Sequence, residues 1–169
     1  HLMYKTLFIC ILLLFFHCNL KAQLVDYKLI MDSLNIALKK AKVDTIKVEI
    51  YLEMGYQTAM NGNNDKSLLF VDTAENIAKK AKWNTGIINA YRYKANMYMA
   101  KGDNVNALKF FKLSLKESER NKDTLGKILA NYNIGNIYQR ENNLNKASEY
   151  YFNGINIAQK VNDTDQTAL

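Results

Sequence analysis

Residues 131–154, NYNIGNIYQRENNLNKASEYYFNG, carry the pattern that decides the fold, because their small residues recur in earlier parts of the chain. Gly135 is preceded by Ala95 and Gly55 at steps of 40 residues. Two further columns with this spacing also hold only Gly, Ala or Ser: Ser67, Ala107 and Ala147, then Ala74, Ser114 and Gly154. A fixed period of this size is typical of a supersecondary unit stacked on copies of itself, so the sequence predicts a solenoid.

Each unit is expected to be a pair of antiparallel helices, since the chain contains no proline to interrupt them. Side chains that can accept hydrogen bonds from a first helical turn mark the expected starts of the first helices: Asp44-Thr45, Asn84-Thr85 and Asp123-Thr124. Gly and Asn tolerate the left-handed conformation that ends a helix, and they mark the expected ends: Gly62-Asn63, Gly102-Asp103 and Asn142-Asn143. The predicted repeats are therefore about 45–83, 84–122 and 123–162.

The two ends of the array are expected to be incomplete. The segment at about 25–42 matches only a second helix, and Asp163-Thr164 is interpreted as the cap of a truncated fourth unit. No polar capping helix follows, although solenoids usually finish with one. We therefore expect the chain to be a fragment, with more repeats or an effector domain downstream.

Residues 133–138, Asn-Ile-Gly-Asn-Ile-Tyr, resemble the core of the first helix in the tetratricopeptide repeat (TPR). The resemblance covers about residues 25–161 and implies an all-α, right-handed α-solenoid of antiparallel helix pairs. The chain departs from the family pattern at Asn131, Lys94 and Thr58, and its period is about 40 rather than 34 residues. This longer variant resembles the arrays of exported bacterial signalling proteins. We expect the Lys94 stem to pack in the core while its ammonium group reaches solvent.

Residues 1–22 have the order of a secretory signal peptide: Lys5, an apolar run over residues 7–16, and Ala22 before a plausible cleavage site. An uncleaved signal anchor is the alternative. The bulky residues before Cys18 argue against a lipoprotein site there. The mature domain, residues 23–169, is therefore expected to be exported, periplasmic or extracytoplasmic and membrane-associated.

The mature domain lacks the residues that most catalytic and metal sites require. No histidine follows His17 and no cysteine follows Cys18, which excludes Cys–His and Ser–His catalysis and the usual zinc sites there. The scattered glycines form no phosphate-binding loop. Paired carboxylates such as Glu117 and Glu119 lie in a charged stretch typical of a solvated helix face. The sequence predicts no enzyme activity, no metal and no cofactor.

The resemblance to the TPR family implies a peptide-binding groove on the first helices. Carried onto this chain by position, the groove residues are Glu49, Leu52, Tyr56, Asn89, Arg92, Asn96, Leu129, Tyr132 and Asn136, with Gln139 one turn later. An Arg beside Asn donors could hold a peptide carboxylate or backbone, and tyrosines offer amphipathic contact area. Arg92 with Asn96 resembles the carboxylate-clamp members, although only one basic residue matches. The alternative is that these are ordinary exposed polar positions.

Basic residues near the ends of the second helices form a predicted lysine stripe. Its members are Lys39, Lys40, Lys42, Lys79, Lys80, Lys82, Arg120 and Lys122. They could contact an anionic membrane surface. The simpler interpretation is that cations in the last turn offset the helix macrodipole. The net charge of +7 names no specific partner, and no nucleic-acid-binding fold is recognisable.

The sequence therefore favours a non-catalytic, exported scaffold that binds a protein or peptide through its concave groove. The alternative function is the extracytoplasmic sensory segment of a membrane-bound signalling protein, a histidine kinase or a transcriptional regulator. In that case the effector part and a membrane anchor would lie downstream of Leu169.

Overall fold

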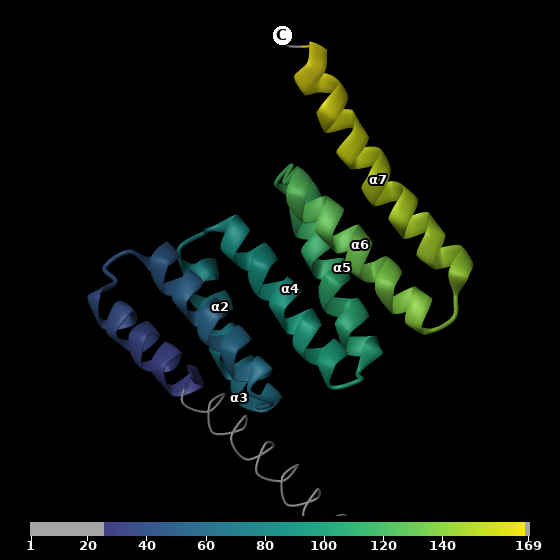
Figure 1. The fold of residues 1–169 in the computed structure, drawn as a ribbon. Coiled ribbons are helices and arrows are strands. Elements are labelled where there is room, and N and C mark those ends of the chain that lie inside the picture. Colours follow the sequence, from purple (N-terminus) through teal and green to yellow (C-terminus); the bar gives the residue numbers. More distant parts are fainter. Residues whose placement is uncertain (1–25, 168–169) are drawn as a thin grey trace, which may run out of the picture.

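The computed structural model describes residues 26–167, with side chains described as far as Val161, so the predicted signal peptide lies outside the described residues. The described part consists of helices joined by short turns, and it contains no strand (Figure 1). An N-terminal helix covers residues 26–40. It is followed by α2 (Asp44–Met60), α3 (Asn64–Lys80), α4 (Asn84–Ala100), α5 (Asn104–Arg120), α6 (Thr124–Arg140) and α7 (Leu144–Thr167).

The helices form two layers. Contacts within units join α2 to α3, α4 to α5 and α6 to α7, and contacts between units join α3 to α4 and α5 to α6. The first helices, α2, α4 and α6, therefore make one layer, which we call the first-helix layer. Helices α3, α5 and α7 make the second-helix layer (Figure 1). Helices α2 to α6 each contain 17 residues, and α2, α4 and α6 begin at residues 44, 84 and 124. The predicted all-α helical-repeat solenoid is confirmed.

Left-handed residues end the helices. Gly62, Gly102 and Asn142 have φ angles of 84°, 79° and 59°, which confirms the three predicted ends of the first helices. The second helices end in the same way at Lys82 and Lys122, with φ angles of 53° and 55°. The sequence analysis missed these two because a lysine side chain gives no sign of a left-handed backbone.

Replacing Lys122 by Gly is expected to raise the free energy of unfolding by about 1 kcal/mol, because Gly removes the Cβ that disfavours a left-handed backbone. Urea denaturation followed by circular dichroism measures the change. The control is Lys116→Gly, at an exposed interior position of α5, which should lose about 1 kcal/mol. Destabilisation by both substitutions would contradict the left-handed turn.

Only one of the three predicted caps of the first helices is correct. Asp123 precedes α6, and its carboxylate accepts a hydrogen bond from the Gly126 N–H at 2.9 Å. Helices α2 and α4 begin at Asp44 and Asn84 themselves, and the preceding Val43 and Trp83 provide no side-chain cap. The regular 40-residue period places Val43, Trp83 and Asp123 in one column, so the prediction was one residue out of register in the first two units.

The three small-residue columns lie in the interior. All nine of their members are buried. A Cβ on Gly55 would stand 2.7 Å from Val71 Cγ2, and one on Gly135 would stand 2.7 Å from Tyr151 Cδ1. Small residues therefore let each first helix approach its own second helix closely, as the sequence predicted.

Helix α7 differs from the sequence-based prediction. It continues without interruption from Leu144 to Thr167, whereas the prediction placed a new unit's cap at Asp163-Thr164. Within the described residues no later helix packs against α7, so no tertiary contact favours a turn at this column. Between residues 26 and 167, no helix is both long and apolar enough to cross a membrane.

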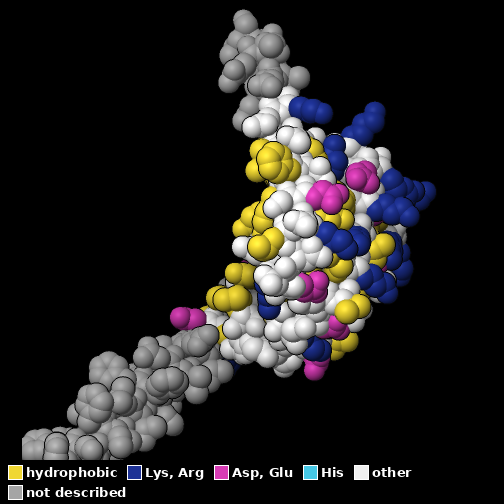
Figure 2. Space-filling view, turned by 90° about the vertical axis from the view of Figure 1, so that its right-hand side faces the viewer, with side chains coloured by type: hydrophobic (Ala, Val, Ile, Leu, Met, Phe, Trp, Pro, Cys, Tyr) yellow, Lys and Arg dark blue, Asp and Glu magenta, His cyan; other side chains and the backbone are white. Residues whose placement is uncertain are grey.

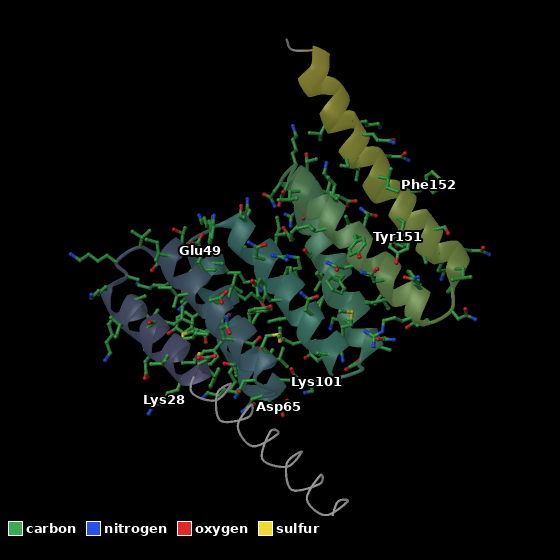
Figure 3. All side chains as sticks on the ribbon, viewed as in Figure 1. Lys28, Glu49, Asp65, Lys101, Tyr151 and Phe152 are labelled. Atoms are coloured by element: carbon green, nitrogen blue, oxygen red, sulfur yellow. The ribbon has the colours of Figure 1, made fainter. Side chains whose placement is uncertain are left out.

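Two sets of ion pairs join the first unit to the second. Lys101 Nζ lies 2.6 Å from Asp65 Oδ1 in an exposed pair, and Figure 3 shows both residues at the lower edge of the array. Lys94 on α4 pairs with Asp72 at 2.5 Å and with Glu75, both on α3. The Lys94 side chain is only 12% exposed, so its ammonium group stays inside the interface between units. The predicted extension of this ammonium group to solvent is wrong, because α3 supplies two carboxylates.

Candidate functional site

The first-helix layer carries the residues predicted for the groove, but it does not expose them equally. Glu49, Tyr56, Tyr132 and Gln139 are exposed, and Asn89, Arg92, Asn96, Leu129 and Asn136 are half-buried. Leu52 is only 5% exposed and belongs to a core cluster with Val48, Val71 and Ala90. The prediction that Leu52 faces the groove is therefore wrong, because the next unit's helix α4 covers it.

Arg92 is the centre of one polar and aromatic cluster on this layer. Its guanidinium carbon lies 5.3 Å from the centroid of the Tyr93 ring, and its Nη2 donates to Asn89 Oδ1 at 3.2 Å. The Tyr93 ring meets Tyr56 edge-on, with centroids 6.5 Å apart. Among the described residues, Arg92 forms no ion pair, and its buried Nε has no hydrogen-bond acceptor. The cluster thus holds a positioned cation against the Tyr93 ring, and no carboxylate among the described residues pairs with it.

The pKa of Tyr93 is raised above its ordinary value of 10.0, chiefly by burial. The neighbouring Arg92 charge opposes this shift, while Glu53 and Tyr56 add to it. Tyr93 therefore stays neutral at physiological pH and presents an uncharged ring to the guanidinium. A neutral aromatic face is the arrangement that favours a cation–π contact.

A second cluster surrounds Tyr151 on α7. Its hydroxyl lies 2.7 Å from Asn136 Oδ1 and 2.9 Å from Gln139 Oε1, so it can donate to either amide. Its ring is 5.9 Å from the Tyr132 ring. The pKa of Tyr151 is raised, first by burial and then by Tyr132, so this hydroxyl also keeps its proton. Figure 3 shows Tyr151 between α6 and α7, at the opposite end of the array from Glu49.

The structure therefore divides the predicted groove into two parts. Tyr56, Asn89 and Arg92 come together, and so do Tyr132, Asn136 and Gln139. The sequence analysis missed Tyr93 and Tyr151, which join each group. Tyr93 directly follows Arg92, and consecutive helix residues do not ordinarily face each other, so the sequence did not indicate this contact. Tyr151 shares its 40-residue column with the fully buried Val71 and Phe111, so its position in the repeat indicates core packing rather than a surface site.

All members of the lysine stripe are exposed. Lys79 pairs with Glu75 and lies over the Tyr91 ring, and Arg120 pairs with Glu117 at 2.9 Å. The pKa of Lys79 is raised above 10.5, first by its hydrogen bond to Glu75. Lys79 and Lys80 lie in the last turn of α3 and Arg120 in that of α5, where cations offset the helix macrodipole.

In the described part of the chain, no group of three or more His, Cys, Asp or Glu side chains is placed to hold a metal ion. The polar groups of the two clusters are amides, tyrosine hydroxyls and one guanidinium. Such groups bind by hydrogen bonding and stacking.

Comparison with solved structures agrees with this architecture. The TPR domain of Arabidopsis FLU superposes with a TM-score of 0.62 at 20% identity, covering 70% of this chain and 99% of that domain. BtubC (BKLC) from P. vanneervenii gives a TM-score of 0.69 at 17% identity, covering 85% of this chain and 58% of that one. MamA gives 0.60 at 19% identity, with coverages of 82% and 74%. No family model matches the sequence, and no curated protein matches it significantly.

At these identities the likeness establishes the fold. The chain is an all-α helical-repeat solenoid of the TPR type, with two polar and aromatic clusters on its first-helix layer. Proteins of this architecture typically serve as scaffolds for protein interaction.

Proposed function

We propose that this chain is a non-catalytic scaffold that binds a peptide segment of a partner protein on the first-helix layer. The observation that carries the proposal is the state of Arg92. Its guanidinium is held by Tyr93 and Asn89, yet no carboxylate among the described residues pairs with it. Most buried donors in proteins have acceptors, so the free Nε of Arg92 also indicates hydrogen-bonding capacity that a ligand can use.

The chemistry of the two clusters specifies the ligand class. Arg92 would bind a carboxylate, from an acidic side chain or a peptide terminus, in a charge-assisted hydrogen bond. Tyr56 and Tyr132 provide exposed rings for apolar side chains. Asn96, which forms no side-chain hydrogen bond with the other described residues, can bond to a peptide backbone. The ligand is thus an extended acidic peptide with apolar residues beside its carboxylate.

Selection of binders from a peptide library, followed by affinity measurement on purified variants, tests this proposal. Arg92→Glu is expected to weaken the selected peptides by at least about tenfold, since a charge-assisted hydrogen bond is worth about 1.5–3 kcal/mol. Lys80→Glu is the matched control, because this substitution makes the same change in charge at an exposed site on α3. It should leave affinity within about twofold.

Circular dichroism of both variants shows whether the fold is intact. Selected peptides that bind the wild type, Arg92→Glu and Lys80→Glu equally well would place the binding surface elsewhere. Peptides weakened equally by both variants would indicate attraction by net charge rather than a site at Arg92.

A further inference from the structure

Helix α5 presents a row of cations on its solvent side that takes no part in the Arg92 cluster. Residues 105, 109, 112, 116 and 120 follow the three- and four-residue spacing that keeps side chains on one helix face. All five are exposed, and we call them the α5 ridge: Val105, Lys109, Lys112, Lys116 and Arg120. Among the described residues, the three lysines have no carboxylate partner. Only Arg120 is paired, with Glu117.

Exposed apolar side chains flank the α5 ridge. The 40-residue register places Leu69 of α3 in the column of Lys109, and Phe152 of α7 in the column of Lys112. Leu69 is 66% exposed and Phe152 is 65% exposed, while Val105 at the start of the ridge is 80% exposed. Figure 3 shows Phe152 projecting away from the array on α7. Cations and apolar groups therefore share the solvent-facing surface of the second-helix layer.

Three carboxylates near this surface are paired, whereas the exposed Glu119 and Glu149 form no ion pair with the described residues. Asp72 pairs with Lys94, Asp65 with Lys101, and Glu117 with Arg120. In the view of Figure 2, Lys and Arg side chains gather along the right-hand edge, whereas hydrophobic side chains gather along the left. The two sides of the array seen in this view thus differ in charge.

We propose that the α5 ridge, with Leu69 and Phe152 beside it, docks on the surface of an anionic phospholipid bilayer. Lysines near such a surface each contribute about 1 kcal/mol of attraction. Dissolved salt screens this attraction. Apolar side chains on the same face enter the boundary between head groups and acyl chains. A nucleic acid would use the lysines for its phosphates but would leave Leu69, Val105 and Phe152 in water. The combination of cations and flanking apolar groups therefore favours a lipid surface.

The two surfaces are independent, because the first-helix layer and the α5 ridge belong to different helix layers. A scaffold of this kind can hold a peptide on one layer while the other rests on a membrane. Membrane docking makes no use of Arg92, so Arg92→Glu should bind vesicles as the wild type does.

Co-flotation with vesicles tests the proposal. The full chain is incubated with phosphatidylcholine vesicles that contain about 30% phosphatidylserine or none. We expect binding to the anionic vesicles only, and loss of binding as the salt rises from about 0.1 M to about 0.5 M. Lys112→Glu with Lys116→Glu should weaken the apparent affinity by at least about 30-fold. The matched control, Lys28→Glu with Lys39→Glu, changes two exposed lysines of the helix at residues 26–40 and should retain binding within about threefold.

A second variant separates lipid from other polyanions. Leu69→Ser with Phe152→Ser leaves the charge unchanged and should weaken vesicle binding by at least about fivefold. Double-stranded DNA and polyglutamate serve as non-lipid probes. Equal losses in the two charge-reversed pairs, full vesicle binding by the Leu69/Phe152 variant, or tighter binding to either non-lipid probe would each overturn the proposal.

Discussion

Replacing Phe111 by Ala is expected to lower the free energy of unfolding by about 4 kcal/mol. Phe111 is fully buried and packs in a cluster that draws residues from four helices, including Ala95 of α4, Ile134 of α6 and Ala147 of α7. Truncation to Ala removes the transfer free energy of the ring and leaves a cavity that rigid helices fill only partly. Folded domains have only about 5–15 kcal/mol of stability in total, so the loss is a large part of it.

Phe152→Ala is the matched control for this experiment. It is the same substitution in the second-helix layer, but at a side chain that is 65% exposed, and it should change stability by less than about 0.5 kcal/mol. Urea denaturation of the two variants beside the wild type makes the comparison. Similar losses in the two variants would contradict the placement of Phe111 at the centre of the interface between units.

Replacing Lys94 by Ala is expected to cost about 3 kcal/mol, because it leaves the buried Glu75 carboxylate with Lys79 as its remaining partner. The Lys94 and Glu75 side chains are only 12% and 9% exposed. Burial alone would raise the pKa of Glu75, but hydrogen bonds from Lys79 and Lys94 outweigh it and hold this pKa below 4.5. Burial alone would lower the pKa of Lys94, but hydrogen bonds to Asp72 and Glu75 hold it above 10.5.

The chain itself supplies the control for this pair. One unit later, the positions of Glu75 and Lys94 are occupied by Leu115 and Ile134, which pack as apolar residues. Glu75→Leu with Lys94→Ile therefore copies an interface that this fold already accommodates. We expect the double variant to lie within about 1 kcal/mol of the wild type or above it. Additive losses in the double variant would contradict coupling between the two charges.

The pH dependence of stability provides a second readout of the same pair. A carboxyl group whose pKa is lowered by folding contributes stability above its ordinary pKa, and that contribution is lost as the pH falls through the folded value. The wild type should therefore lose more stability than the double variant between about pH 6 and about pH 3. At high pH the raised pKa of Lys94 acts in the opposite sense, since its contribution disappears as the pH rises beyond 10.5.

Local chemistry made part of this structure predictable from the sequence. The left-handed turns at Gly62, Gly102 and Asn142 were correct because Gly and Asn act within their own turn. The small-residue columns were correct because close helix packing excludes large side chains wherever it occurs. Both rules depend on a residue and its immediate contacts, and the repeat tests each of them three times.

The remaining features depend on contacts between units, which a single repeat does not specify. Leu52 was assigned to the groove by position in a family pattern, yet α4 covers it. Lys94 was expected to reach solvent, yet Asp72 and Glu75 lie across the interface from it. Tyr151 occupies a core column, but its hydroxyl reaches the amides of the first-helix layer.

The regular 40-residue spacing has a genetic consequence. Residues in equivalent columns occupy equivalent turns, so removing residues 83–122 would join Lys82 directly to Asp123, which follows Lys122 in the intact chain. Both lysines have the same left-handed backbone. Recombination between two such turns would shorten or lengthen the array by a whole unit without altering the junction. Insertion of a unit between the Arg92 and Tyr151 clusters would lengthen the peptide needed to span them, whereas loss of residues 83–122 would remove the Arg92 cluster itself.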